Sequence, residues 1–296
     1  MRRFKVDPDV YFGTPGQYVK LPWPVGGVEA SVDRSTYDFV SGAGNHRVST
    51  LVGTSRSYLL NWKALHQINY DLINQFYLGH NGPGPFVILD PSRPNLLTAN
   101  QSAATGQTFD TSGFIASSGT LSSQKAAAAI YRQFGRRGLQ WTGTGTTVMS
   151  ISMASTFTNW LGIPVLPLAT YTFNYFMTAS AGSMTGGPQL KWLTASGTTI
   201  RTDAPTQTTW SGWAQQVLTA VAPPNAAYVV PAMNVLMLVG GQTVYADALQ
   251  LEDTQYLNEW APGTGVLPVA IMDWNEDIPF DGMMRLGPTL ALRELL

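Results

Sequence analysis

The amino-acid sequence predicts a mainly β protein with two domains: an α+β sandwich that contains one helix, and a second β-sandwich inserted into it. Short runs rich in β-branched and aromatic residues, separated by Gly, Pro and Asn, recur along the 296 residues and are typical of short strands. Residues 65–78 repeat their apolar side chains at helical spacing, whereas the inserted segment shows almost no such periodicity. Charge also divides the chain, because residues 98–261 hold 12 charged residues among 164, whereas the other 132 residues hold 23.

This change in composition places the domain boundaries at residues 97 and 261. Residues 1–97 and 262–296 then form the outer domain, and residues 98–261 form the inserted one. The inserted segment has 38 Ser and Thr against 13 outside it, so hydroxyls replace charges as its solvating groups. With 17 basic and 18 acidic residues the net charge is −1, which favours association and argues against a general nucleic-acid-binding surface.

The outer domain begins with strands that are separated by glycine-rich turns. We expect these strands at residues 17–21, 37–40, 47–52 and 56–62. A helix follows, and Gly79 is its expected stop. Its apolar stripe consists of Leu65, Ile68, Leu72, Ile73, Phe76 and Tyr77. Residues 86–89 form a buried strand, and the C-terminal runs 267–274 and 284–295 are expected to pair with this domain.

The inserted segment contains many strand-like runs and almost no helical periodicity. The runs are residues 147–153, 170–178, 189–194, 210–218, 228–239 and 243–251. Strands at this spacing, with Gly, Pro and Thr between them, indicate a sandwich or jelly roll. Residues 123–134 fit either a short helix or an edge strand.

Several simple functional classes are excluded by composition. The chain has no Cys, which removes disulfides, thiolate nucleophiles and Cys-ligated metal sites. The first residues lack the apolar run of a secretion signal, so we expect none. Prolines at 223, 224 and 231 interrupt the longest weakly charged stretch, so we expect no membrane insertion.

Five segments of the outer domain share their pattern with a known family. They are Arg56-Ser-Tyr-Leu-Leu-Asn-Trp62, residues 73–79, Gly82-Pro-Gly-Pro-Phe-Val-Ile-Leu-Asp-Pro91, Asn95-Leu-Leu97 and Leu290-Ala-Leu-Arg-Glu294. In these segments the chain resembles the distal tail proteins of long-tailed bacteriophages, a kind of minor tail protein. The resemblance implies a belt-type β-sandwich domain that closes a ring.

The second half of the inserted segment resembles a different group of proteins. The relevant runs are Trp210-Ser-Gly-Trp213, residues 221–230, Val244-Tyr-Ala-Asp-Ala-Leu-Gln-Leu-Glu252 and Trp260-Ala-Pro-Gly263. They are similar to the jelly-roll carbohydrate-binding modules, which occur in phage tails. Asn95-Leu-Leu97 also resembles the usual opening of such modules, which would put the first boundary a few residues before residue 97. The resemblance implies an inserted jelly-roll β-sandwich.

Together, the two resemblances imply a structural protein of the virion tail tip or baseplate. It would form a homo-oligomeric ring, a homohexamer by family resemblance, that joins the tail tube protein to the tail hub and tip proteins. DNA would pass through the lumen without sequence-specific contact. The inserted sandwich would point outward for protein or host-glycan contacts. The alternative function is a glycan-binding receptor-recognition tip protein, in which the sandwich does the main work.

The second resemblance also implies one metal candidate and no other cofactor. Carbohydrate-binding jelly rolls often hold a structural calcium, partly through an acid of the last strand, and Asp247 stands at that place. Calcium takes about six to eight oxygen ligands, so a further ligand such as Asp110 is required. The alternative is that Asp247 caps a loop or pairs with a neighbour.

Aromatic residues of the inserted segment are the candidates for glycan contact, because an aromatic face stacks on a sugar ring. They are Trp141, Trp160, Trp192 and Trp210. A sandwich core also needs large aromatic side chains, so each of the four is a core candidate too. We expect Trp213 to pack inside.

We predict that the chain is not an enzyme. The acidic cluster consists of Asp273, Glu276, Asp277 and Asp281. It does not fit a calcium loop, because Ile278 replaces the required Gly. A glycosidase carboxylate pair is the other interpretation of this cluster, and a solvated turn or subunit contact is the one that we prefer. The histidines, at positions 46, 66 and 80, are scattered, and the chain has no nucleophile elbow or phosphate loop.

Overall fold

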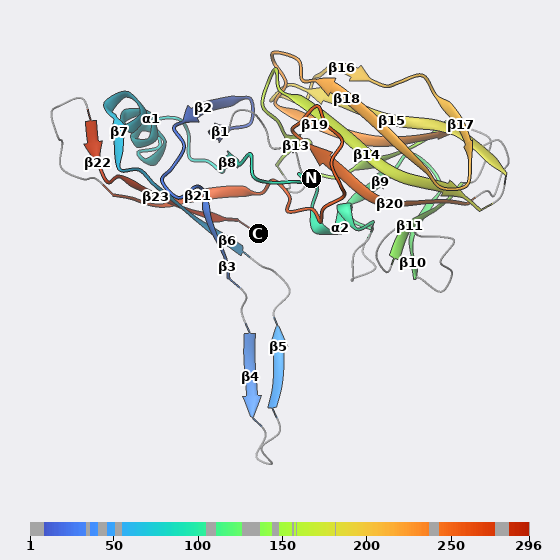
Figure 1. Ribbon diagram of the computed structural model, residues 1–296, viewed down its shortest axis with the longest axis horizontal. Coiled ribbons are helices and arrows are strands. Elements are labelled where there is room, and N and C mark those ends of the chain that lie inside the picture. Colours follow the sequence, from blue (N-terminus) through green and yellow to red (C-terminus); the bar gives the residue numbers. More distant parts are fainter. Residues whose placement is uncertain are drawn as a thin grey trace. The chain divides into compact units, whose positions relative to one another are not determined.

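The computed structural model describes most of the chain. The described parts are residues 9–33, 36–40, 46–50, 55–104, 111–125, 137–143, 148–155, 157, 159–180, 182–236, 243–275 and 284–295. They form two compact units. The sheet–helix unit contains residues 9–14, 18–90 and 267–295, and the sandwich unit contains residues 15–17 and 91–266. Strands dominate both units (Figure 1), so the predicted mainly β class is confirmed.

The sheet–helix unit is built on a seven-stranded sheet with the order β2-β1-β8-β21-β23-β6-β3. Its elements are β1 Val10–Thr14, β2 Gln17–Leu21, β3 Glu29–Asp33, β4 Thr36–Val40, β5 His46–Thr50, β6 Ser55–Asn61, β7 Ala64–His66, α1 Gln67–Tyr77, β8 Phe86–Leu89, β21 Pro268–Asn275, β22 Met284–Leu286 and β23 Thr289–Glu294. β21 pairs with β8, and β23 pairs with β6. The predicted pairing of the C-terminal runs with the N-terminal domain is therefore confirmed.

Helix α1 packs its apolar stripe into the core of this unit. Tyr70, Ile73 and Phe76 are buried, and the Phe76 ring lies 5.3 Å from the Phe12 ring of β1. The expected helix began two residues too early, because Leu65 belongs to β7, where it pairs with Arg285 of β22. Ile68 was also wrongly placed on the stripe, since it lies in the first turn and is 64% exposed.

Strands β4 and β5 form a ribbon of their own. They pair only with each other, from Thr36 opposite Thr50 to Val40 opposite His46 (Figure 1). In the sequence this pair lies between β3 and β6, which pair with each other up to Asp33 opposite Ser55. Both outer edges of the ribbon are therefore without a strand partner among the described elements.

The sandwich unit consists of two sheets. One is five-stranded, with the order β10-β11-β20-β14-β18; the other follows β16-β15-β19-β12-β9, with β13 on β19 and β17 on β15. The elements are α2 Ala99–Ser102, β9 Phe114–Ala116, β10 Thr120–Lys125, β11 Arg137–Thr142, β12 Val148–Met153, β13 Ile163–Pro164, β14 Thr170–Ala179, β15 Ser183–Leu193, β16 Thr199–Asp203, β17 Thr208–Ser211, β18 Ala214–Val221, β19 Tyr228–Leu236 and β20 Thr243–Glu252.

Large aromatic side chains join the two sheets. Tyr171 of β14 lies in the first sheet and Trp192 of β15 in the second, and their ring centroids are 5.8 Å apart. Both residues are almost fully buried, and removal of their apolar surface from water stabilises the packing of the two sheets. The close approach of β15 and β19 requires Gly186, because a Cβ atom there would lie 2.2 Å from the carbonyl oxygen of Asn234.

The first and last segments of the sandwich unit run side by side. The backbone N–H of Gly265 donates to the carbonyl oxygen of Leu97 at 2.8 Å, and Leu96 donates to Leu251 at 2.8 Å. A Cβ atom at Gly263 would lie 2.2 Å from the Leu97 oxygen, so only Gly fits there. By its contacts the unit begins at Pro91 rather than after residue 97, because Asn95 is buried among these segments.

Two expected strands are interrupted by turns. Residues 210–218 form parts of β17 and β18, with Gly212 between them at a φ of 72°. Residues 284–295 are likewise divided into β22 and β23 by Gly287, at a φ of 67°. Positive φ is easy only for Gly, so both interruptions have a local cause. Of residues 123–134, the first three belong to β10, an edge strand, and the rest lie outside the described residues.

Candidate interaction site

Three of the four candidate glycan-contacting tryptophans are buried. Trp141 and Trp192 are 0% exposed and Trp160 is 6% exposed. The indole N–H groups of Trp141 and Trp192 donate inward, to the carbonyl oxygen of Ser118 at 2.9 Å and to Asp203 Oδ2 at 2.8 Å. Neither ring offers a face to a sugar, so the structure corrects the glycan-contacting assignment of these residues. Large aromatic side chains such as these pack between the two sheets of a sandwich and form its core.

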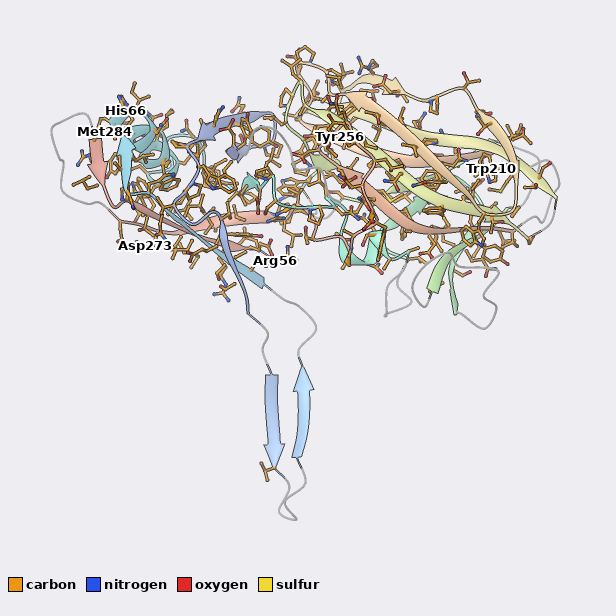
Figure 2. All side chains as sticks on the ribbon, in the orientation of Figure 1. Arg56, His66, Trp210, Tyr256, Asp273 and Met284 are labelled. Atoms are coloured by element: carbon orange, nitrogen blue, oxygen red, sulfur yellow. The ribbon has the colours of Figure 1, made fainter. Side chains whose placement is uncertain are left out.

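Trp210 is the exception among the four. It lies on β17, opposite Met184 of β15, and is partly exposed (Figure 2). Its indole nitrogen is buried and has no hydrogen-bond partner among the described residues. The adjacent cross-strand pair, Thr185 and Thr209, whose Oγ1 atoms lie 2.7 Å apart, points to the opposite face of these two strands, because successive side chains alternate. Trp213 is also partly exposed rather than fully inside as expected.

Asp247 lies in β20 with a side chain that is only 2% exposed. Its Oδ1 accepts the backbone N–H of Ala248 at 2.7 Å, next to an irregularity in the pairing of β14 with β20. Among the described residues, no three His, Asp or Glu side chains come together as a metal site would require. Calcium also takes backbone and amide oxygens, so the calcium site at Asp247 stays a prediction. Asp110, the second ligand expected, lies outside the described residues.

The remaining candidate residues do not converge. Asp273 is exposed on β21 (Figure 2), and its expected companions Glu276, Asp277 and Asp281 lie outside the described residues. His66 caps helix α1, where its Nδ1 accepts the backbone N–H of Ile68 at 3.3 Å. His80 follows the same helix in an exposed turn. In the part of the chain that the structure describes, no helix is long and apolar enough to span a bilayer.

The most distinctive feature of the sheet–helix unit is an open side of β21. Its pairing with β8 is limited to Pro268 opposite Val87 and Val269 opposite Phe86, whereas its pairing with β23 continues to Asn275. Pro83 and Pro85 stand just before β8, and proline has no N–H with which to continue a ladder. On the β8 side, residues 270–275 therefore have no strand partner among the described elements.

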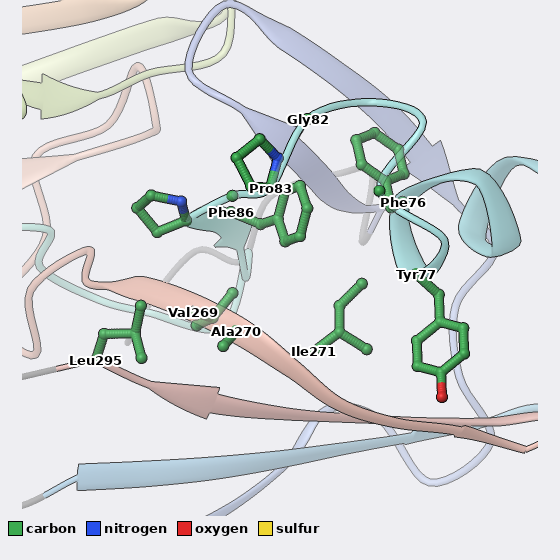
Figure 3. Close-up of a pocket in the computed structure, with 12 residues that line it drawn as sticks. Phe76, Tyr77, Gly82, Pro83, Phe86, Val269, Ala270, Ile271 and Leu295 are labelled. Carbon is green, nitrogen blue, oxygen red and sulfur yellow. The ribbon is translucent and has the colours of Figure 1, made fainter.

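A pocket of about 430 Å³ lies beside this open side. Its walls come from α1, the loop before β8, β21 and the end of β23 (Figure 3). The lining residues are Phe76, Tyr77, Gly79, Gly82, Pro83, Gly84, Pro85, Phe86, Val269, Ala270, Ile271 and Leu295. None of them is charged, so the pocket suits apolar groups, and the Tyr77 hydroxyl is its one polar side-chain group.

Large apolar side chains are exposed around the same unit. They are Trp23, Val25, Val40, Leu59, Ile68, Tyr77, Leu78, Met272, Leu286 and Leu295. Single exposed apolar residues are ordinary on a monomer, and of this set Tyr77 and Leu295 line the pocket. The sequence did not predict this site. Its one signal was the pair of prolines before residues 86–89.

A buried carboxylate lies on the other side of β21, where β23 pairs with β6. Glu294 is 3% exposed, and it accepts hydrogen bonds from the Tyr58 hydroxyl and, at 3.2 Å, from the backbone N–H of Arg56. The Arg56 guanidinium lies 3.9 Å from the same carboxylate. The partners of this carboxylate lie within its own unit, so its role is structural. Glu294 does not line the pocket, whose walls carry no charge.

Comparison with known proteins gives only partial structural likenesses. No protein family matches the sequence, and neither does any curated protein. The enzymatically active domain of bacteriophage CBA120 tailspike protein 4 is similar with a TM-score of 0.39 and 12% identity over 53% of this chain. The C-terminal family 22 carbohydrate-binding module of Clostridium thermocellum Xyn10B is similar with a TM-score of 0.37 and 17% identity over 51% of this chain.

A third similar structure is the carbohydrate-binding module TmCBM61 in complex with β-1,4-galactotriose, with a TM-score of 0.36 and 14% identity over 54% of this chain. The matched part is 21% of the tailspike chain, but 91% and 99% of the two modules. For a Clostridium thermocellum xylanase that carries such a module, the matched part is 30% of the xylanase chain. At these TM-scores the likenesses do not assign a function to this chain.

Proposed function

We propose that this chain is a non-catalytic structural protein of a phage tail tip, and that it assembles into a homo-oligomeric ring. The observation that carries the proposal is the incomplete strand pairing of the sheet–helix unit, in which the β4–β5 ribbon and the open side of β21 both lack strand partners among the described elements. Proteins usually cover or pair such edges. A ring of identical subunits pairs them by repeating one heterologous contact until it closes.

The assignment to a phage tail rests on the sequence resemblance of the outer domain to distal tail proteins. On that basis the ring has six subunits and joins the tail tube protein to the tail hub and tip proteins at the tail tip of the virion. DNA would pass through its lumen. The small net charge of −1 fits this proposal, because it limits repulsion between identical subunits.

Native mass spectrometry of the purified chain, with negative-stain imaging, tests the ring directly. We expect a closed species of one stoichiometry, six subunits, with a central hole. A chain that stays monomeric over the whole micromolar concentration range would refute the proposal. Loss of the ring in a Gly186→Ala variant would not refute it, because a Cβ atom at this position clashes with β19 and damages the sandwich core.

Glycan binding by the sandwich unit is the second candidate function, and Trp210 is the observation that favours it. This tryptophan is partly exposed, and its indole nitrogen has no hydrogen-bond partner among the described residues. An aromatic face can stack on a sugar ring, and an indole N–H can donate to a sugar hydroxyl.

The test of this second candidate is retention of the chain on host cell-wall polysaccharide. Trp210→Ala should abolish retention, while Tyr256→Ala, which removes another exposed aromatic ring from the same unit, should not. If Trp210→Ala is retained as well as the unaltered chain, none of the four candidate tryptophans binds the glycan, because the other three are buried. Release of sugar fragments during the assay would contradict the non-catalytic assignment.

A further inference from the structure

One tryptophan of the sheet–helix unit is left largely uncovered. Trp23 lies in the loop between β2 and β3 and is 41% exposed, more than any other of the nine tryptophans, all of which the structure describes. Val25, two positions further on, is 48% exposed. Tryptophan is among the side chains that contribute most to the binding energy of protein interfaces. The loop of residues 22–27, here called the Trp23 loop, is therefore a candidate contact surface.

Hydrogen bonds and a tight turn hold the Trp23 loop in place. The carbonyl oxygen of Pro22 accepts the indole N–H of Trp62 at 2.9 Å, and the backbone N–H of Gly27 donates to the carbonyl oxygen of Pro24 at 3.1 Å. A Cβ atom at Gly27 would lie 3.5 Å from Trp23 Cζ2, so the glycine leaves this edge of the indole uncovered. A loop that is already ordered loses little conformational entropy when it binds.

The pocket of the same unit has the chemistry that an indole requires. Pockets of roughly 300–1,000 Å³ hold drug-sized ligands, which are larger than an indole, and this pocket measures about 430 Å³. The rings of Phe76 and Phe86 meet edge to face in its wall, 5.4 Å apart (Figure 3), and aromatic rings favour a further aromatic neighbour. The one polar side-chain group of the lining is the Tyr77 hydroxyl, and a buried indole N–H needs one acceptor.

Two comparisons select Trp23 as the occupant of this pocket. Among the exposed apolar residues that the structure describes in this unit, only Trp23 and Tyr77 carry a side-chain hydrogen-bond donor, and Tyr77 belongs to the pocket itself. Residues 22–28 contain no charged residue, and neither does the pocket lining. The two surfaces can therefore meet without burying an unpaired charge, which would be costly.

We infer that Trp23 of one copy enters the pocket of the next copy, where its indole N–H donates to the Tyr77 hydroxyl. This inference rests on the proposed ring and names two surfaces that meet in it. The contact is heterologous, since a loop meets a pocket, and its repetition around an axis closes a ring. One aromatic side chain buries about 150–250 Å², against roughly 800 Å² per partner in a stable interface. Trp23 is thus the anchor of the contact, and the surfaces around it supply the remaining area.

Substitution of the anchor tests the contact in a dilution series followed by native mass spectrometry. Trp23→Ala should raise the concentration needed for half-assembly by about tenfold or more, as loss of an interface anchor does. Tyr77→Phe keeps the pocket wall and removes only the acceptor, so it should raise this concentration by about threefold. The matched control is Leu286→Ala, at a residue of the same unit that is also 41% exposed, and it should stay within about twofold.

Thermal unfolding of the same variants excludes a folding defect. All three side chains are exposed, so their unfolding temperatures should stay close to that of the unaltered chain. An effect of Leu286→Ala on assembly as large as that of Trp23→Ala would overturn the inference, because exposure alone would then decide the result.

Cross-linking gives a second readout that leaves the anchor intact, and the absence of native Cys makes it selective. Val25→Cys lies in the Trp23 loop, and Leu78→Cys lies beside Tyr77 at the end of α1 next to the pocket, where Leu78 is 57% exposed. A chain with both substitutions, treated with a short bismaleimide, should give a ladder of covalent oligomers that ends at the ring size. The matched control replaces Leu78→Cys by Ile68→Cys, in the first turn of the same helix and 64% exposed, and should remain monomeric in a denaturing gel.

The outcomes separate the inference from the proposed function. If the unaltered chain forms no ring, the proposed function fails and the inference with it. If the ring forms but Trp23→Ala assembles normally, or the pair at positions 25 and 78 gives no intermolecular link, only the inference is overturned. Loss of assembly in Trp23→Ala, together with a ladder from the pair at 25 and 78 that the pair at 25 and 68 does not give, supports both.

Discussion

The side-chain amide of Asn95 donates a hydrogen bond to the carbonyl oxygen of Ala261 at 2.9 Å, across 166 positions of the chain. The same nitrogen donates to Leu249 at 3.0 Å, and the amide oxygen accepts from the backbone N–H groups of Leu97 and Leu251, both at 3.1 Å. Both donors and both oxygen lone pairs of this side chain are thus in use. Asn95 joins the first segment of the sandwich unit to its last strand and to the segment after it.

Asn95→Leu should destabilise the sandwich unit by roughly 3 kcal/mol or more, because it leaves four buried backbone groups without their partner. Urea unfolding, followed by circular dichroism, measures the change. The control is Asn225→Leu, an exposed position in a turn, which should shift stability by less than about 0.5 kcal/mol. Equal effects of the two substitutions would show that the Asn95 hydrogen bonds are not stabilising.

Trp192→Ala should cost about 3–5 kcal/mol of folding free energy, because it removes a fully buried ring and leaves a cavity. It also leaves Asp203 without the indole N–H that it accepts at 2.8 Å. Thermal unfolding of the sandwich unit is the measurement. Tyr256, an aromatic residue of the same unit that is 36% exposed, is the control position, and Tyr256→Ala should cost under about 1 kcal/mol. A stable, fully folded Trp192→Ala protein would contradict the assignment of this ring to the core.

Burial raises the pKa of the Tyr175 hydroxyl well above its ordinary value of 10. In the unfolded chain this group ionises near pH 10, whereas in the folded chain it stays protonated. The unfolded state therefore binds fewer protons above pH 10, and stability falls there by about 1.4 kcal/mol per pH unit for this one group. Stability below pH 9 is unaffected by it.

Tyr175→Phe removes this dependence. The Tyr175 hydroxyl has no hydrogen-bond partner among the described residues, so its loss should be neutral or slightly stabilising at pH 7. Between pH 10 and pH 11 the variant should lose less stability than the unaltered chain, as measured by urea unfolding at each pH. Parallel curves for the two proteins would disprove the burial of this hydroxyl in the folded state.

Glu294→Ala should destabilise the sheet–helix unit by about 3 kcal/mol, because it removes the acceptor of the Tyr58 hydroxyl and the counter-charge of Arg56. Glu294→Gln keeps the shape and one acceptor, so it should cost about half as much. Thermal unfolding measures both. Glu29→Gln, at an exposed position on β3, should leave the unit unchanged, and a similar loss at both sites would refute the structural role of Glu294.

Local patterns predicted the elements whose causes are local. Residues 17–21 and 86–89 were expected as strands with the bounds that the structure has, because alternating or continuous apolar runs between turn residues are read directly from neighbouring positions. The expected helix was correct except at its start. Leu65 fits a helical stripe equally well, and only its pairing with Arg285, far along the chain, places it in a strand.

The sequence by itself determined the strand-rich class, the single long helix and the division into a charge-poor, Ser/Thr-rich segment and flanking segments, because composition and short-range periodicity carry that information. Only the tertiary structure decided which tryptophans are buried and which side of β21 stays open. Trp192 and Trp210 look alike in sequence, and the difference between 0% exposure and partial exposure comes from the strands that cover them. The open side of β21 depends on where β8 stops beside a strand more than 170 positions away, a relationship that no local pattern contains.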